Sequence, residues 1–154
     1  MDINFRPAAV DTGDGGRLAQ EMAAEIAELY DGLDHNGPDM PAAGPAQLGP
    51  PAGGFWVGYD GTTAVCCGGI KRLSDTVCEI KKMYVVRTAR GQGIARRMLT
   101  LLEGEARALG YAVVRLDTGP RQGDAQHLYE TAGYVTIDNF NDHPMATYFG
   151  EKQL

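Results

Sequence analysis

Two stretches of the chain place apolar residues at the three-to-four-residue spacing of an amphipathic helix. The first follows Asp14, a candidate N-cap, and stops at Asn36-Gly37-Pro38; its apolar positions are Leu18, Met22, Ile26, Leu29 and Leu33. The second stops at Gly110, a typical C-terminal glycine, and its apolar stripe is Ala95, Met98, Leu99, Leu102, Ala106 and Leu109. A shorter stripe, closed by Gly133, predicts a third helix from Ala125, Leu128 and Ala132.

Most of the remaining chain outside these helices has sequence patterns typical of strands. Residues 55–59, 62–73 and 77–86 are separated by the turn signals Asp60-Gly61 and Ser74-Asp75, which predicts an antiparallel meander. Further short strands are predicted at residues 3–6, 113–117, 134–137 and 145–149. Because strands and helices alternate in the second half, the sheet should be partly parallel there.

Residues 36–54 contain ten Pro or Gly residues and no helix or strand pattern. A long segment without its own secondary structure is uncommon in a compact domain unless it is functional or mobile. We interpret this Pro/Gly-rich loop as a flexible cover on the substrate side. A plain surface connection is the alternative.

Length and composition fit one globular domain. The chain has 154 residues, 44% of them hydrophobic, which is enough for a core but too few for two ordinary domains. No run is long and apolar enough to cross a bilayer, and residues 1–10 lack the apolar stretch of a secretory signal. We therefore expect a cytoplasmic protein with a single domain over residues 1–154 and no membrane partner.

The formal net charge of −6 disfavours a nucleic-acid partner. The charge is unevenly distributed. Ten of the fourteen Lys and Arg residues lie between Lys71 and Arg115, against four acidic residues, so this segment carries +6 and the remainder −12. A basic middle suits a polyanionic ligand such as a phosphorylated cofactor. The acidic remainder suits a cationic substrate or serves solubility.

The chain has three cysteines, Cys66, Cys67 and Cys78, an odd number without paired spacing, which argues against a disulfide framework. If their segment is a strand, Cys66 and Cys67 point to opposite faces. No Cys-x-x-Cys or His-x-x-x-His spacing indicates a metal site, so no metal is expected.

The turn before the second helix carries the clearest chemical signal. Gly91 and Gly93 precede a helix whose first amide N–H groups lack intrahelical partners and, with the positive end of the helix dipole, form an anion site. Glycine lets the backbone approach an anion without a Cβ clash, and Arg90, Arg96 and Arg97 add positive charge. An ordinary glycine-containing turn is the alternative.

Two nucleotide-binding patterns fail at this turn. It lacks the Gly-x-x-x-x-Gly-Lys-Ser/Thr pattern of nucleoside triphosphatases. Arg96 stands at the third glycine position of the dinucleotide-binding fingerprint. A nucleotide or dinucleotide enzyme is therefore disfavoured.

Three motifs, in order along the chain, resemble the GNAT superfamily of acetyl-CoA-dependent N-acetyltransferases. The turn from Arg90 to Ala95 matches the family's Arg/Gln-x-x-Gly-x-Gly/Ala pattern. Residues 79–85 resemble the family's fourth strand, and residues 125–134 resemble its last helix and the strand that follows. The strong match covers about Gly68 to Tyr134. It implies an α/β (α+β) fold with a central mixed, mostly antiparallel twisted sheet of six to seven strands flanked by helices.

The resemblance also implies acetyl-CoA as the acyl donor. Its pyrophosphate would lie on the turn formed by Arg90, Gly91, Gln92, Gly93, Ile94, Ala95 and Arg96. Met83, Tyr84 and Val85 would hold the pantetheine arm where the family strand splays from its neighbour, and a main-chain N–H there would stabilise the developing oxyanion. Many members carry Asn seven residues before the tyrosine of the last helix. Here Gln122 stands at that place, an amide of different reach.

Amine attack on a thioester needs a base, because an alkyl amine is mostly protonated at neutral pH, and an acid for the leaving thiolate. The resemblance implies Tyr129 as the acid and Glu79 as the base. The alternatives are a packing tyrosine and a solvated carboxylate paired with Lys81. Asp117 and Thr118, at a strand end near the expected cleft, are further candidates for substrate contact. His127 is expected at the surface.

The expected function is N-acetyl transfer from acetyl-CoA to a primary amine of a small molecule or an amino terminus, by direct attack. A covalent acyl-enzyme on cysteine is disfavoured because no motif places a histidine beside one. A non-catalytic acyl-CoA sensor and a protein lysine acetyltransferase are the alternatives. Similar proteins commonly dimerise, so the resemblance is compatible with a homodimer, and no motif identifies the acyl acceptor.

Overall fold

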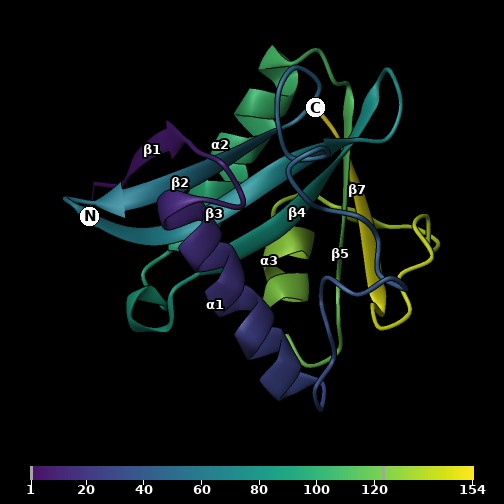
Figure 1. The fold of residues 1–154 in the computed structure, drawn as a ribbon. Coiled ribbons are helices and arrows are strands. Elements are labelled where there is room, and N and C mark those ends of the chain that lie inside the picture. Colours follow the sequence, from purple (N-terminus) through teal and green to yellow (C-terminus); the bar gives the residue numbers. More distant parts are fainter. Residues whose placement is uncertain (1, 123) are drawn as a thin grey trace.

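The computed structural model describes residues 2–122 and 124–154; Met1 and Gly123 of the predicted domain lie outside the described residues. The elements follow one another in the order shown in Figure 1. They are β1 (Asn4–Pro7), α1 (Gly13–Leu29), β2 (Gly54–Asp60), β3 (Thr63–Arg72), β4 (Val77–Val85), the 3-10 turn η1 (Arg87–Ala89), α2 (Ile94–Ala108), β5 (Val113–Thr118), α3 (Ala125–Thr131), β6 (Val135–Thr136) and β7 (Tyr148–Gln153).

The seven strands of the described chain form one sheet in the order β1-β2-β3-β4-β5-β7-β6. Strands β1 to β4 pair antiparallel, as the predicted meander. Strand β4 pairs parallel with β5, and the chain crosses between them through α2, the kind of connection that a parallel pair requires. Strand β7 lies antiparallel between β5 and β6. The predicted mixed, mostly antiparallel sheet flanked by helices is confirmed.

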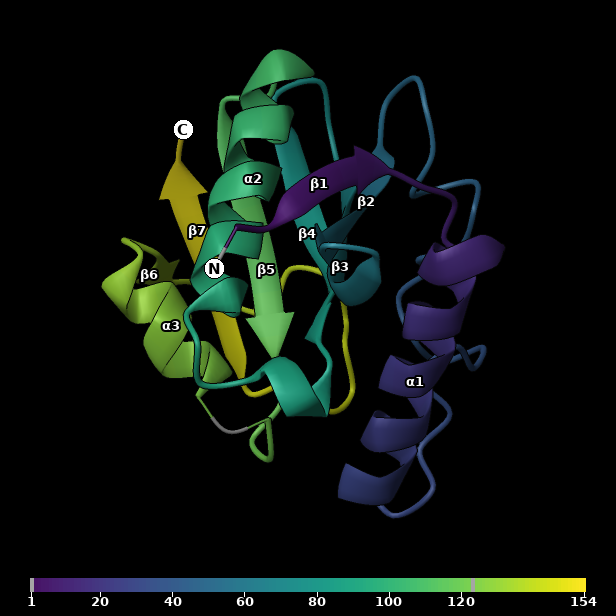
Figure 2. The same cartoon turned by 90° about the vertical axis from the view of Figure 1, so that its left-hand side faces the viewer.

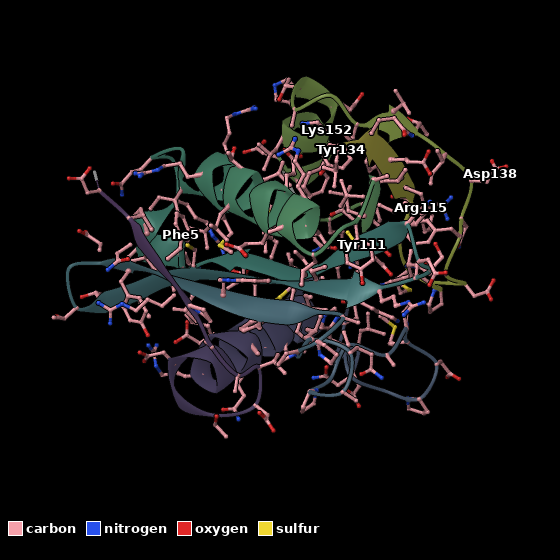
Figure 3. The ribbon with its side chains drawn as sticks, turned by 90° about the horizontal axis from the view of Figure 1, so that it is seen from above. Phe5, Tyr111, Arg115, Tyr134, Asp138 and Lys152 are labelled. Atoms are coloured by element: carbon pink, nitrogen blue, oxygen red, sulfur yellow. The ribbon has the colours of Figure 1, made fainter. Side chains whose placement is uncertain are left out.

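Helix α1 covers one face of the sheet, and α2 covers the other together with α3 (Figures 2 and 3). Strand β3 lies between both layers, so its residues from Ala64 to Ile70 are all buried instead of alternating. Gly68 lies under α2: a Cβ there would come within 2.7 Å of Leu102 Cδ1. The missing side chain lets the helix approach the sheet closely.

Helix α1 is shorter than its apolar pattern predicts. Asp31 and Gly32 follow its last turn with φ angles of 58° and 91°, a left-handed backbone that ends the helix before Leu33. Its N-cap is Thr12 and not Asp14. Asp14 lies in the first turn, where it accepts a 2.6 Å hydrogen bond from Tyr59 Oη.

The last strand begins three residues later than the prediction of residues 145–149 and continues to Gln153. Pairing with β5 sets this register, since Thr118 lies opposite Tyr148 and Val113 opposite Gln153. The strand passes through Glu151 and Lys152, charged residues that an apolar pattern does not count. Strand β6 is only two residues long, where four were predicted.

The Pro/Gly-rich loop lies on the α1 side of the sheet. Its Leu48 is buried in a cluster with Leu18 and Phe55. Tyr111 Oη donates to the carbonyl of Ala52 at 2.6 Å, so the loop is tied to the strands at its end. In the described part of the chain no helix is both long and apolar enough to cross a membrane.

A candidate active site between the splayed strands

A cleft opens where β4 and β5 part. Their parallel ladder has three residue pairs and stops at Glu79 and Arg115, although β4 continues to Val85 and β5 to Thr118. On its other side, β4 has a bulge that sets two residues, Lys82 and Met83, against the single Gly68 of β3. A bulge bends its strand and increases the local twist. The bulged half of β4 thereby presents an unpaired edge to the cleft.

The cleft has a volume of about 880 Å³ and is lined by several elements that are far apart in the sequence. Helix α1 and β4 form one wall, and the starts of α2 and α3 with the end of β5 form the other. Such a volume suits a ligand of cofactor size. The predicted site residues that line it are Met83, Tyr84, Val85, Arg90, Gly91, Gly93, Ile94, Ala95, Arg96, Gln122 and Tyr129.

The start of α2 has the geometry of an open anion site, and we refer to residues 90–96 as the candidate anion cradle. Gly93 is the N-cap with φ 76°, and Gly91 has φ 78°, so both occupy the left-handed region that favours glycine. A Cβ at either glycine would meet no atom within 4 Å. The first intrahelical bond of α2 is donated by Arg97 N to Gly93 O, which leaves the amides of Ile94 to Arg96 without intrahelical acceptors. Gln92 is exposed and does not line the cleft.

An α1 carboxylate holds the arginines beside this cradle. Glu25 Oε2 accepts from Arg90 Nη2 at 2.7 Å, and Glu25 Oε1 accepts from Arg87 Nη2 at 2.9 Å. Burial opposes the ionisation of Glu25, but the hydrogen bonds from Arg90 and Arg87 outweigh it and lower its pKa. Sequence analysis did not single out Glu25, although it lies at helical spacing from Leu18 and Met22 on the inward face of α1. It reaches Arg90 only in the fold.

We expect Glu25→Gln to tighten the binding of CoA by about threefold to tenfold, because it removes one negative charge from the cradle and frees Arg90. Isothermal titration with CoA would measure the change. Glu28→Gln is the matched control: it lies on the same helix with 76% of its side chain exposed, 3.7 Å from Arg87. Weaker binding in Glu25→Gln would mean that Glu25 serves to hold Arg90 in place.

Tyr129 lies at the middle of the cleft. Its side chain is buried, and its ring lies 5.9 Å from that of Tyr134 and 6.4 Å from that of Tyr148. Burial, with a smaller contribution from Asp117, raises the pKa of the phenol well above its usual value. Within residues 2–122 and 124–154 its hydroxyl has no hydrogen-bond partner. The phenol is therefore protonated at neutral pH and available to a ligand.

Glu79 is completely buried behind the cleft wall and is not among the lining residues. Its Oε2 accepts from Lys81 Nζ at 3.2 Å and from Asn141 Nδ2 at 2.9 Å, while Oε1 has no partner among the described residues. Burial raises its pKa. Asp117 does line the cleft, and it shares the Asn141 amide at 2.6 Å. Glu79 is thus linked to the cleft directly by Lys81 and, through Asn141, by Asp117.

His143 and His35 complete this end of the cleft, and both stay uncharged at neutral pH. Burial lowers the pKa of each, to about 4 for His35. His143 Nδ1 accepts the backbone amides of Met145 and Ala146 at 3.1 and 3.0 Å. A nitrogen that accepts two N–H groups carries no proton, so the neutral ring has its proton on Nε2 and offers a donor. Asn141 and His143 had no signal in the sequence because they lie in a segment without a motif, and Lys82 lies within the matched strand at residues 79–85 but was not singled out.

The cofactor candidate Gln122 joins the β5–α3 loop to the end of α1. Its Oε1 accepts from Gly119 N at 2.9 Å and from Tyr30 Oη at 3.3 Å. Arg121 Nη1 donates to the carbonyl of Leu29 at 2.8 Å. These contacts bridge the two walls at the outer rim of the cleft.

The cysteines lie outside the cleft, although Cys67 Sγ donates to the backbone carbonyl of Lys82 at 3.4 Å. All three are buried and none lines the cleft. Burial raises the pKa of the Cys66 thiol to about 11 and that of Cys78 to about 12, and it raises that of Cys67 further. His127 is exposed, as predicted. Among the described residues no group of three His, Cys, Asp or Glu side chains is placed to hold a metal ion.

Comparison with known proteins agrees with this geometry. Residues 21–134 match the model of the acetyltransferase (GNAT) family. The chain is 33% identical over 128 residues to an IAA acetyltransferase from Azospirillum brasilense, covering 82% of this chain and 80% of that protein. A structure from Klebsiella pneumoniae described as a candidate acyl-CoA N-acyltransferase has a TM-score of 0.79 and 26% identity, covering 99% and 97% of the two chains. A GNAT acetyltransferase from Elizabethkingia anophelis with acetyl-CoA bound shares the fold, with a TM-score of 0.68 and 15% identity over 99% and 98%.

Proposed function

The chain belongs to the GNAT family of acetyltransferases, and on this premise we propose that it transfers an acetyl group from acetyl-CoA to the primary amine of a small molecule by direct attack. One observation carries the proposal: the open anion cradle at the start of α2 and the protonated Tyr129 line the same continuous cleft. Thioester aminolysis with a CoA leaving group needs a site for the anionic part of CoA and a proton donor for the leaving thiolate, in addition to a base for the amine.

The residues of the cradle fit a pyrophosphate. The free amides of α2 and the space in front of Gly91 and Gly93 accept a doubly charged group at close range. Arg90 and Arg96 line the same space. The unpaired edge of β4 at Met83 to Val85 can pair with the amides of a pantetheine arm that lies in the splay. A main-chain N–H in this stretch is the proposed donor to the oxyanion.

Gly93→Ala tests the cradle. We expect a loss of CoA affinity of about tenfold, and about 1 kcal/mol of stability, because an L-residue is strained at φ 76° and its Cβ enters the phosphate space. Titration calorimetry and thermal unfolding would measure both. Gly104→Ala is the control, since this helical glycine also has free space around its Cβ. It should bind CoA normally and melt slightly higher. Unchanged affinity in Gly93→Ala would place the phosphate elsewhere.

The chemical step divides between two groups. Tyr129 is proposed to give its proton to the sulfur that leaves. Glu79 is proposed to receive the proton of the amine through water that would bridge the amine to it, while the Asn141 amide donates to the carboxylates of both Glu79 and Asp117 and so holds them together. Acetylation of an amine leaves no net proton in the site, because the acid loses one and the base gains one.

Thiol release decides the function. Pure protein is incubated with acetyl-CoA and a panel of small primary amines, and free CoA is followed with a thiol reagent. We expect release that depends on a particular amine. Binding of acetyl-CoA without release for any amine would favour a sensor, and release only with a lysine-containing protein would favour a protein acetyltransferase. Absence of any acyl-CoA binding would overturn the proposal.

A further inference from the structure

Lys82 is a buried cation in the cleft wall without a carboxylate beside it. The residue is only 7% exposed, and it lines the cleft. Its Nζ donates one hydrogen bond, to the neutral Oδ1 of Asn36 at 2.8 Å. No carboxylate oxygen of a described residue lies within 4 Å of it. A buried ammonium is normally paired with an anion, because desolvation strongly disfavours the lone charge. The structure therefore has a place for an anion that the protein itself does not supply.

The backbone at Lys82 is also unfavourable. Its φ angle is 55°, in the left-handed region that a lysine rarely adopts, and it lies in the bulge of β4. A glycine or asparagine would relieve this strain. Strained residues with unpaired charges concentrate at ligand sites, where the surrounding structure holds them in position. The bulge places Lys82 between the cleft and a second cavity of about 560 Å³, which Asn36 also lines.

The charges near Lys82 fall into two groups of opposite sign: a net negative cluster around Lys81, and Lys82 itself. Lys81 Nζ lies 3.2 Å from Glu79 Oε2 and 4.0 Å from Asp117 Oδ2, so one cation serves two carboxylates and that cluster keeps an excess negative charge. Lys82 carries the excess positive charge nearby. His35, Lys81, Lys82 and Asp117 all line the cleft. The neutral His143 adds an N–H donor there.

We propose that Lys82 binds a carboxylate of the acyl acceptor, so that the acceptor is an amine that also carries a carboxylate, of the amino-acid class. This inference rests on the proposed acetyl transfer. The ammonium end of such a molecule matches Asp117, which lies near Tyr129, and its carboxylate matches Lys82. In the reaction the amine nitrogen bonds to the acetyl carbon and the carbon–sulfur bond breaks. The ammonium group first gives one proton to solvent; during attack a second proton of the nitrogen goes to the base, the sulfur takes the proton of Tyr129, and the carboxylate is unchanged.

The kinetic test compares amino acids with their own carboxamides. The panel holds α-amino acids, amino acids with a more distant amine, and the matching amides, with rates expressed per concentration of free amine. For the unsubstituted protein we expect kcat/KM to be about tenfold or more higher for the amino acid than for its carboxamide. Lys82→Met should reduce this preference to within about twofold and leave the affinity for CoA unchanged. Lys71→Met is the control, because Lys71 bonds the carbonyl of Ala42 away from the cleft and should keep the preference.

A binding test separates this inference from the proposed function. The N-acetylated form of the best amino acid, and its amide, are titrated into the CoA-saturated protein by calorimetry. The acid should bind about tenfold more tightly than the amide in the protein and equally in Lys82→Met. Failure of all amines to release thiol would overturn acetyl transfer, whereas equal binding of acid and amide by the protein would overturn the carboxylate site. Equal loss of both ligands in a Lys82→Met variant that melts normally would also overturn it.

Discussion

Tyr129→Phe is expected to lower kcat by about a hundredfold or more, because a general acid in place contributes at least that factor. The affinity for acetyl-CoA should change by less than about twofold, since the phenyl ring keeps its packing against Tyr134 and Tyr148. The hydroxyl has no partner among the described residues, so its removal leaves no unsatisfied group behind. Steady-state kinetics at saturating amine, with titration of CoA, would measure both quantities.

Tyr148→Phe is the matched control for this variant. Tyr148 stacks beside Tyr129, and its buried hydroxyl has no hydrogen-bond partner among residues 2–122 and 124–154, but it does not line the cleft. Its removal should leave kcat unchanged. If Tyr129→Phe kept the full kcat, Tyr129 would have no part in the proton transfer, and its burial would then serve only packing.

Gly53→Ala is expected to destabilise the fold by about 3 kcal/mol, at the upper end of overpacking effects. A Cβ at Gly53 would lie 2.3 Å from the carbonyl oxygen of Gln47 and 2.4 Å from that of Ile70. Both atoms belong to the backbone, so neither can move aside by a change of rotamer. The Pro/Gly-rich loop would have to shift away from β3 to accommodate the methyl group.

Denaturant unfolding followed by circular dichroism would measure the free energy of unfolding. Gly44→Ala controls for alanine in the same loop, because its Cβ would meet only the flexible Gln47 side chain, at 3.6 Å. It should change stability by less than about 0.5 kcal/mol. A Gly53→Ala protein as stable as this control would show that the loop can shift at little cost.

Much of the fold could be predicted because its helices and strands carry local periodic patterns. The stripe of α2 predicted a helix whose apolar side is buried against the sheet, and the turn signals at Asp60-Gly61 and Ser74-Asp75 set off the meander. Strand β7 was partly missed because pairing with β5, and not its own apolar content, fixes where it begins and ends. The end of α1 was missed because Asp31 takes a left-handed backbone that no spacing reveals.

The candidate site also has one part that the sequence could indicate and one part that it could not. The candidate anion cradle is contiguous in the chain, from Arg90 to Arg96, so glycine spacing and a helix start could indicate it, although an ordinary turn stayed open until the flanking motifs were considered. The proposed acceptor end of the cleft, around Asp117 and His143, is assembled from α1, β4, β5 and the segment before β7. The residues that form it share no sequence motif. Glu25, Lys82 and Asn141 become neighbours of the chemistry only through tertiary packing. Nothing in the sequence indicates that β4 has a bulge at Lys82.

The burial of the three cysteines affects how the activity of the protein can be measured. Cys66 and Cys67 lie on β3 and Cys78 lies on β4, the antiparallel pair next to the splay. Only a thiolate reacts with a thiol reagent, and these thiols stay protonated while they are buried. The cysteines of the folded protein should therefore add almost no background signal when released CoA is measured with a thiol reagent. The slow rate at which the protein's own cysteines are labelled would then report how often the centre of the sheet opens. A ligand that closes the cleft should lower this labelling rate.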